Sequence, residues 1–237
     1  MINTAIILAG GFGTRLQAVV NDLPKPMAPV NGQPFLNYQL NYLKHYGVKK
    51  IILSVGYLSE KIKNYYGSIF NGLEIEYVVE EKPLGTGGGI RLALEKCTDE
   101  LAFVLNGDSF FDVDLSKFYD HHSMQNAQVS LSLRKVKDAG RYGTIEKNTD
   151  NRIISFKEKS GNTNEGIING GVYIIDKKIY LNSTAPNSNF SIEKDFFEKQ
   201  LNTLKIYGFE FEGYFIDIGI PEDYTTAQND LKGFKYK

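Results

Sequence analysis

The sequence has one cysteine and almost no excess charge, and each shortage excludes a class of protein. Its 237 residues include the single cysteine Cys97. One thiol cannot form an internal disulfide or a zinc site built from several cysteines. The formal net charge is -1 at pH 7. Bulk charge therefore does not attract a nucleic acid, and an anionic ligand must be held by a few placed cations and by backbone N–H groups.

No long apolar run opens the sequence. The run at residues 5–9 has no basic region before it and is too short for a signal peptide or a membrane span. We therefore expect a cytoplasmic protein without a membrane partner. Hydrophobic residues make up 42% of the chain and charged residues 23%, which indicates a globular fold with a sizeable core.

Short apolar runs alternate with helix-like segments in the first half. The runs lie at 5–9, 50–55, 74–79 and 101–105, and the helix-like segments at 34–46, 59–66 and 87–96. This alternation predicts a doubly wound, Rossmann-like α/β fold with a mostly parallel sheet and helices on both faces. Ligands of such sheets bind beyond the carboxyl ends of the strands. That rule gathers residues 10–15, 55–57, 80–89 and 106–108 around one crevice.

The second half predicts a smaller, mixed β portion. Residues 128–134 alternate Val129, Leu131 and Leu133 with polar residues, which is typical of a half-buried strand. Further strands are expected near 143–146, 152–157 and 171–175, and helices over 115–122, 192–201 and 222–231. Asp114 would cap the first of these helices. Because no low-complexity linker or internal repeat interrupts the chain, we expect a single domain over residues 1–237.

A glycine-rich string follows the first predicted strand, reading Leu8-Ala9-Gly10-Gly11-Phe12-Gly13-Thr14-Arg15-Leu16. Glycines let backbone N–H groups approach an anion, and an arginine fork suits phosphate oxygens. Lys25, between two prolines, adds a second cation. The string lacks the Walker Gly-Lys-Ser/Thr, and Leu16 stands where the dinucleotide fingerprint needs a glycine or alanine. A phosphate loop and an ordinary strand-to-helix turn with a solvated arginine both fit these residues.

The string, followed by Lys25-Pro26-Met27, resembles the signature of the sugar-1-phosphate nucleotidyltransferases. The similarity continues in that family's order through Leu84-Gly85-Thr86-Gly87-Gly88-Gly89, Asn106-Gly107-Asp108, Glu158-Lys159, Asn169-Gly170-Gly171 and Asp217-Ile218-Gly219-Ile220-Pro221-Glu222-Asp223-Tyr224. These strings span nearly the whole chain. The resemblance implies an enzyme that joins a nucleoside triphosphate (NTP) to a sugar 1-phosphate and releases pyrophosphate.

The same resemblance implies a nucleotide-binding half over about 1–110 and a sugar-phosphate half over about 111–237. Arg15 and Lys25 would neutralise the triphosphate and the developing pyrophosphate. Asp108 and Asp217 would hold Mg²⁺, which prefers one or two carboxylates besides phosphate oxygens and water. The other nucleotide-binding residues that it implies are Leu8, Ala9, Gly10, Gly11, Gly13, Thr14, Glu81, Pro83, Gly85, Thr86, Asn106 and Gly107.

On the sugar side, the resemblance implies that Lys159 contacts the sugar phosphate and Glu158 a sugar hydroxyl. The other sugar-binding residues that it implies are Gly143, Asn169, Gly170, Gly171 and Glu193, with Asn169-Gly170-Gly171 forming a turn. Simpler interpretations exist for some of them. Lys159 fits a solvated surface lysine beside Lys157, and Glu193 fits an acid in the first turn of a helix capped by Ser191.

The substrate pair is suggested by few residues. Residues 83–88 are most similar to guanylyltransferases acting on D-glycero-D-manno-heptose 1-phosphate, since many mannose 1-phosphate enzymes have alanine where Gly87 stands. A Glu81 carboxylate that accepts from guanine N–H groups would agree with GTP. We therefore expect GTP and a heptose 1-phosphate as partners, GDP-heptose for a surface polysaccharide as product, no nucleic acid, and a monomer or a homodimer.

Other interpretations stay open. One is the same reaction with another pair, GTP with mannose 1-phosphate or UTP with an amino-sugar 1-phosphate. Another is a regulatory subunit that binds a nucleotide sugar without turnover, and a third is a nicotinamide-dependent oxidoreductase. The imperfect glycine fingerprint disfavours the oxidoreductase.

The histidines His45, His121 and His122 lie on predicted helices away from the crevice. The transfer needs no general base, because a phosphate monoester loses its second proton near pH ~6.

Overall fold

One sheet of ten strands runs through the computed structural model, which describes residues 2–11, 20, 22–157 and 164–236. Its strands are β1 (Thr4–Ala9), β4 (Lys50–Val55), β5 (Ile69–Phe70), β6 (Leu73–Val79), β7 (Leu101–Asn106), β9 (Val129–Val136), β10 (Thr144–Lys147), β11 (Ile153–Lys157), β12 (Gly166–Asp176) and β13 (Ile206–Glu210). Two small antiparallel pairs join β2 (Pro29–Val30) to β3 (Gln33–Pro34) and β8 (Ser109–Phe111) to β14 (Phe215–Asp217).

The helices connect these strands and follow the last of them. They are η1 (Lys25–Met27), α1 (Phe35–His45), α2 (Ser59–Tyr66), α3 (Gly85–Lys96), α4 (Leu115–Met124), α5 (Lys177–Asn182), η2 (Ile192–Phe197), α6 (Glu198–Gln200) and α7 (Pro221–Asp230). Asp114 caps α4, because its carboxylate accepts from the backbone N–H of Lys117. None of the helices in the described ranges is long and apolar enough to cross a membrane.

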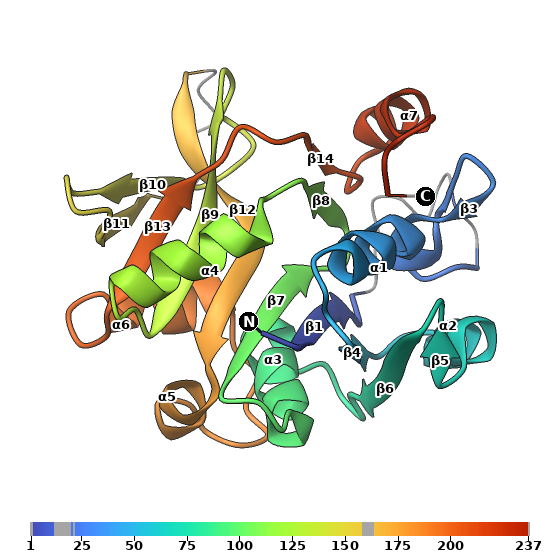
Figure 1. The fold of residues 1–237 in the computed structure, drawn as a ribbon, viewed down its shortest axis with the longest axis horizontal. Helices are drawn as coiled ribbons and strands as arrows, with labels where there is room; N and C mark the ends of the chain where they lie inside the picture. Colours follow the sequence, from blue (N-terminus) through green and yellow to red (C-terminus); the bar gives the residue numbers. More distant parts are fainter. Residues whose placement is uncertain (1, 12–19, 21, 158–163, 237) are drawn as a thin grey trace.

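The centre of the sheet is parallel and one side of it is mixed (Figure 1). β6, β4, β1 and β7 lie side by side and run parallel, as the alternation of the first half predicts. β12 then pairs with β7 in the antiparallel sense, and it carries β10 and β9. The predicted doubly wound core with a smaller mixed β portion is therefore confirmed.

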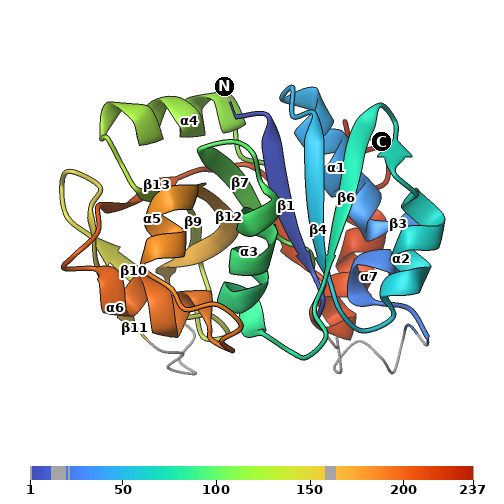
Figure 2. The ribbon, with the colours of Figure 1, turned by 90° about the horizontal axis from the view of Figure 1, so that it is seen from below.

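Each face of the sheet has its own hydrophobic core, because neighbouring residues of a strand point to opposite sides. Ile7 of β1 packs in the cluster that includes Leu40 of α1 and Phe118 of α4. Ile6 packs in the other cluster, with Ile90 of α3 and Tyr180 of α5. Figures 1 and 2 show α1 and α4 against one face and α3 and α5 against the other.

Strand β9 corrects one expectation. Its alternating pattern predicts a half-buried strand, but both of its faces are covered, and Ser130 and Ser132 are fully buried. Ser130 Oγ lies 2.8 Å from Nδ1 of the buried His122 on α4. The serines therefore serve as polar partners inside the protein rather than as a solvent-exposed face. A helix packed on the second face overrides the polarity pattern of the strand.

Burial of His122 predicts a pH-dependent stability. Burial lowers the pKa of His122 to about 4, whereas an unfolded histidine titrates near ~6.5. The unfolded chain therefore binds the proton first as the pH falls. The stabilisation is complete above about pH 6.5 and declines toward pH 4, by up to roughly 3 kcal/mol. Urea unfolding of wild type and His122→Asn at several pH values between these limits measures the effect, which the variant should lack.

The adjacent His121 is exposed and supplies the matched control. His121→Gln should keep the wild-type dependence of unfolding free energy on pH. A His122→Asn profile parallel to that of wild type across the same range would contradict the assignment to His122.

Candidate functional site

A pocket of 390 Å³ lies beyond the carboxyl ends of β1, β4 and β6 and is called here the first hollow. It is lined by Leu8, Gly10, Gly11, Gly56, Tyr57, Glu80, Glu81, Lys82, Pro83, Gly85 and Thr86. The second hollow, of 250 Å³, is lined by Leu8, Ala9, Gly11, Lys25, Pro26, Thr86, Asn106, Gly107 and Asp108. Because Leu8, Gly11 and Thr86 line both, the two hollows are adjacent.

Two further hollows extend the row toward the mixed β portion. The third, of 160 Å³, is lined by Asn106, Asp108, Ser109, Tyr142, Gly143, Asn169, Gly171, Glu193, Phe215 and Asp217. The fourth, of 210 Å³, is lined by Gly143, Thr144, Ile145, Phe156, Lys157, Asn169, Glu193, Lys194 and Glu198. The third shares Asn106 and Asp108 with the second, and it shares Gly143, Asn169 and Glu193 with the fourth. The row therefore leads from the glycine-rich strand end, past both aspartates, to the β10–β11 hairpin.

Asp108 and Asp217 are brought together by the short β8–β14 pair. Asp217 is opposite Ser109 in that pair, and the backbone N–H of Ile218 donates to the Asp108 carbonyl at 2.9 Å. Lys25 Nζ lies 2.7 Å from Oδ2 of Asp108, with the lysine side chain 13% and the carboxylate side chain 42% exposed. The middle of the row thus brings the carboxylates of Asp108 and Asp217 close to the ammonium group of Lys25.

The surroundings of Asp217 disfavour its negative charge. Burial raises the pKa of Asp217, and the charge of Asp108 raises it further. Lys25 and the Gly219 N–H, which donates to Oδ1 at 2.7 Å, act in the opposite direction. A second cation between the carboxylates would relieve this repulsion. The described residues contain no group of three or more His, Cys, Asp or Glu side chains that could hold a metal ion by themselves.

The loop that carries Asp108 is fixed from two sides. The Gly107 N–H donates to the Leu8 carbonyl at 3.0 Å, which joins the ends of β7 and β1. From α1, the buried Gln39 amide donates to the carbonyls of Asn106 and Ser109, both at 2.7 Å. Gln39 is a polar residue on the side of α1 where apolar residues repeat at helical spacing. Such a residue is the sequence signal that could have identified it.

The loop after β6 is fixed by Glu80. Its carboxylate accepts from the Leu84 N–H at 2.9 Å and from the Ser54 hydroxyl at 3.2 Å. The neighbouring Glu81 stays exposed and lines the first hollow. Glu80 therefore shapes the loop, and Glu81 presents its carboxylate to the hollow.

Helix α3 ties this loop to the segment before η2. The Gly87 N–H donates to the Phe190 carbonyl at 2.9 Å, and the Thr86 hydroxyl accepts from the Ile192 N–H at 3.0 Å. Asn189 also donates to the Pro83 carbonyl at 2.9 Å. Thr86 lines the first two hollows, and Glu193, which follows Ile192, lines the last two. These bonds hold opposite ends of the row in one register.

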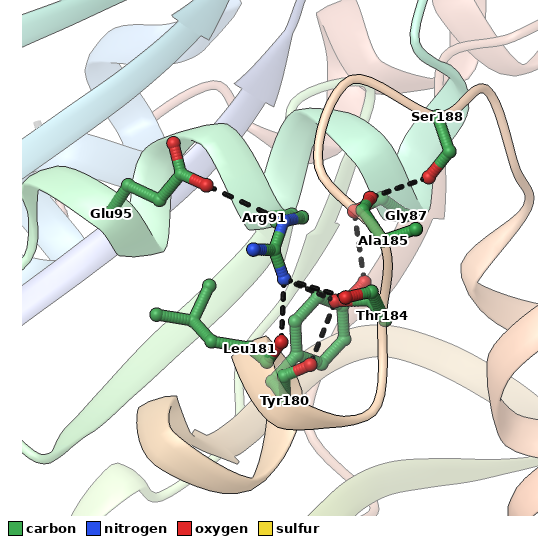
Figure 3. A network of polar contacts seen from close by, with 8 residues as sticks. All are labelled: Gly87, Arg91, Glu95, Tyr180, Leu181, Thr184, Ala185 and Ser188. Atoms are coloured by element: carbon green, nitrogen blue, oxygen red, sulfur yellow. Dashed lines mark hydrogen bonds and ion pairs between the residues drawn. The ribbon is translucent and has the colours of Figure 1, made fainter.

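Arg91 anchors the same segment from the middle of α3 (Figure 3). Its guanidinium donates to the Leu181 carbonyl at 2.7 Å and to the Thr184 carbonyl and hydroxyl at 2.9 Å. Glu95, one turn along α3, lies 3.4 Å from Nε. Tyr180 adds a bond from its hydroxyl to the Gly87 carbonyl at 2.9 Å. The arginine therefore satisfies the Leu181 carbonyl in the last turn of α5, which the helix itself leaves without a partner, and the Thr184 carbonyl just beyond the helix.

A bulge in β12 shapes the third and fourth hollows. The pairing register with β9 shifts between Asn169 and Tyr173, and Gly171 has a φ of +76°. The expected turn at 169–171 is therefore wrong, because these residues lie inside a bulged strand. Asn169 Nδ2 lies 2.6 Å from Glu193 Oε1 and 2.8 Å from the Tyr173 hydroxyl. Gly170 lies behind the hollows, where an added Cβ would come within 2.4 Å of Phe111.

Most residues that the sequence singles out gather in this row. Gly13, Thr14, Arg15, Glu158 and Lys159 lie outside the described residues. Apart from Gly170, every other predicted site residue lines at least one hollow. Several residues of the third and fourth hollows were not predicted from the sequence: Ser109, Tyr142, Thr144, Ile145, Phe156, Lys157, Lys194, Glu198 and Phe215.

The comparisons with known proteins agree with this architecture. A model of the nucleotidyl transferase family matches residues 4–233. A D-glycero-alpha-D-manno-heptose 1-phosphate guanylyltransferase of Aneurinibacillus thermoaerophilus is 47% identical, covering 97% of this chain and 99% of the relative. An enzyme of the same name from Campylobacter jejuni is 46% identical over 93% of this chain and 96% of its own.

A solved structure shares the whole fold. HddC from Yersinia pseudotuberculosis, complexed with GMP-PN, has a TM-score of 0.85 and 39% sequence identity, covering 98% of this chain and 100% of HddC. With a family model matched over nearly its whole length and relatives of this identity, the chain belongs to the nucleotidyl transferase family.

Proposed function

We propose that the protein catalyses the transfer of GMP from GTP to D-glycero-α-D-manno-heptose 1-phosphate, which gives GDP-heptose and pyrophosphate. The observation that carries the proposal is the row of adjacent hollows, with Lys25, Asp108 and Asp217 at its middle. A row of this kind accommodates two anionic substrates end to end. The names of the relatives supply the substrate pair: two are heptose 1-phosphate guanylyltransferases, and HddC was crystallised with a guanine nucleotide analogue.

The nucleotide is assigned to the first two hollows. Glu81, Pro83, Gly85 and Thr86 would surround the base, and Leu8, Ala9, Gly10 and Gly11 would face the ribose and phosphates. Asn106 and Gly107 would border the α-phosphate. Gly13 and Thr14 would complete the phosphate loop, and Arg15 would join Lys25 in neutralising the triphosphate. Backbone N–H groups and fixed cations suit this task, because they stabilise charge without reorganising.

The two aspartates fit a magnesium ion. Burial raises the pKa of Asp217 and the neighbouring charge of Asp108 raises it further, so a cation between the two carboxylates would relieve their repulsion. Two carboxylates match the preference of Mg²⁺ for one or two protein ligands together with phosphate oxygens and water. When bound, the ion would supply positive charge next to the α-phosphate.

The transfer itself requires alignment more than proton chemistry. A phosphate oxygen of the sugar 1-phosphate would bond to the α-phosphorus while the bond to pyrophosphate breaks. The attacking phosphate is mostly ionised at pH 7, so no side chain needs to remove a proton. The third hollow, with Gly143, Asn169, Gly171 and Glu193, would hold the sugar. Lys159 would steer its phosphate and Glu158 would bind a hydroxyl. Rate enhancement would come from positioning and from charge compensation.

The direct test is a matrix of purified NTPs against sugar 1-phosphates, read by pyrophosphate release. The expected result is the highest kcat/KM for GTP with the heptose 1-phosphate. If kcat/KM is higher for GTP with mannose 1-phosphate, or for UTP with an amino-sugar phosphate, the proposed substrate pair is wrong and that pair takes its place. If none of the pairs of NTP and sugar 1-phosphate releases pyrophosphate, the proposed reaction is wrong.

Glu81→Gln tests base recognition separately from catalysis. If the Glu81 carboxylate accepts from guanine N–H groups, the amide should lower the preference for GTP over UTP by roughly tenfold or more, while kcat at saturating GTP changes little. The ratio of kcat/KM for the two triphosphates is the measurement. Glu60→Gln, an exposed change on α2 outside the four hollows, is the control. An unaltered ratio in Glu81→Gln would show that another group reads the base.

A further inference from the structure

The fourth hollow lies beyond the place assigned to the sugar ring and is larger than the third, at 210 Å³ against 160 Å³. Its inner wall is apolar, formed by the buried Ile145 and by Phe156. The Phe156 ring stacks on Phe197, with centroids 6.0 Å apart and planes 14° apart. Its rim is polar, with Lys157 held by Glu146 at 2.5 Å. A flat apolar wall under a polar rim suits a short carbon chain bearing hydroxyl groups.

The helix beside this hollow has an unusual geometry that turns two carboxylates toward it. Residues 192–197 form a π-helix, and the Glu198 N–H donates to the Glu193 carbonyl five residues earlier. In an α-helix, residues five apart point about 140° away from each other. The wider π turn brings such residues closer to one face, and π segments are frequent at functional sites. Glu193 and Glu198 accordingly line the same hollow.

We propose that the fourth hollow receives the end of the exocyclic chain of a seven-carbon sugar 1-phosphate, and that Glu198 accepts a hydrogen bond from the hydroxyl that a hexose lacks. This inference rests on the proposed function. The third hollow contains Asp108 and Asp217 and therefore takes the phosphate and the ring. Gly143, Asn169 and Glu193 border both hollows, so a substituent that leaves the ring away from the phosphate enters the fourth.

The chemistry of the sugar matches this division. The chain of a hexose ends in a hydroxymethyl group at C6. In a heptose, C6 keeps its hydroxyl and carries one further hydroxymethyl group, C7, whose hydroxyl the hexose lacks. The carbons can lie against the Phe156 ring, and a carboxylate accepts the hydroxyl protons. Glu193 is already bonded to Asn169 at 2.6 Å, at the border of the ring hollow. Glu198, farther along the helix, is left to bind the end of the chain.

The test compares two sugar phosphates in two variants. For Glu198→Ala, we expect kcat/KM with the heptose 1-phosphate to fall roughly ten- to hundredfold, mainly through KM. The value for mannose 1-phosphate should stay unchanged, because that substrate does not reach Glu198. Glu198→Gln keeps an acceptor oxygen, so its kcat/KM with the heptose 1-phosphate should fall less than that of Glu198→Ala. Where mannose 1-phosphate is not turned over, its inhibition constant against the heptose substrate replaces kcat/KM.

The exposed Glu165, which pairs with Lys135 outside the four hollows, provides the control. Glu165→Gln should leave kcat/KM unchanged for both sugar phosphates. Equal losses for both substrates in Glu198→Ala, or no change in their ratio, would overturn the role of Glu198. Failure of the proposed function looks different, because wild type would then form no GDP-heptose from GTP and the heptose phosphate.

Discussion

Replacing Asp217 by asparagine is expected to lower kcat by roughly 10²–10³-fold, and at the same time to leave the metal-free protein as stable as wild type or more stable. The loss of turnover follows because an amide oxygen lacks the charge that Mg²⁺ prefers. Asp108→Asn should lower kcat in the same way. Rates measured over a Mg²⁺ titration would show a higher requirement in both variants, and EDTA should abolish wild-type turnover.

The stability part follows from the pKa of Asp217. Because burial and Asp108 raise that pKa in the folded protein, the ionised carboxylate is less favourable there than in the unfolded chain. The destabilisation is present at neutral pH, and it disappears as the pH falls through the raised pKa. The asparagine variant lacks this charge, and its amide oxygen can still accept from the Gly219 N–H. Thermal unfolding at pH 7 with EDTA would therefore give an equal or higher Tm.

Ligand-induced stabilisation separates the two effects. Mg²⁺ with GTP should raise the Tm of wild type, since a ligand that binds only the folded state stabilises it, and should raise that of Asp217→Asn much less. Glu222→Gln, an exposed change in the first turn of α7, is the control. If the wild-type protein keeps its full turnover in the presence of EDTA, neither aspartate binds a metal ion that the reaction needs.

Replacing Gly107 by alanine is expected to damage stability and turnover together. A Cβ at this position would lie 2.3 Å from the Leu8 carbonyl oxygen. That oxygen belongs to the backbone of β1 and also accepts the Gly107 N–H at 3.0 Å, so neither side can rotate away. Overpacking typically costs about 1–3 kcal/mol, and a backbone clash lies at the upper end. For a chain of this length, the Tm should fall by roughly 5–10 °C.

The effect of Gly107→Ala on turnover follows from its neighbour. Asp108 lies between Gly107 and the β8–β14 pair, so separating the ends of β1 and β7 displaces its carboxylate. A shift of about 1 Å at a catalytic site can lower the rate roughly 10²-fold. Thermal unfolding and steady-state kinetics on one preparation measure both effects.

Gly11→Ala is the stability control, because a Cβ there meets no described atom within 4 Å. Its Tm should remain at the wild-type value. A Gly107→Ala protein with wild-type Tm and kcat would show that the two strand ends can separate without consequence.

The parallel core and the place of the crevice can be predicted from the order of the residues alone. Apolar runs of strand length alternating with helical periods leave few arrangements for 4–9, 50–55, 73–79 and 101–106, and parallel strands end at one edge. The glycine-rich strings at those ends fit an ordinary turn as well as a phosphate loop, and only their resemblance to a known family assigned residues of the first two hollows to nucleotide binding. Local pattern was sufficient for the place of the crevice, because each strand and the loop after it are contiguous in the chain.

The rest of the site depends on contacts between segments that are far apart in the chain, so it cannot be predicted from local patterns. Asp217 reaches Asp108 through the pairing of β14 with β8, which are too short to produce a periodic signal. Ser130 is buried because α4 covers the second face of β9. The alternation of polar and apolar residues in the strand does not predict that a helix packs there. The π turn places Glu198 beside Glu193, although apolar spacing predicts an ordinary helix over 192–201. Side-chain pattern specifies which residues seek burial, whereas packing partners decide which faces are covered and which side chains meet.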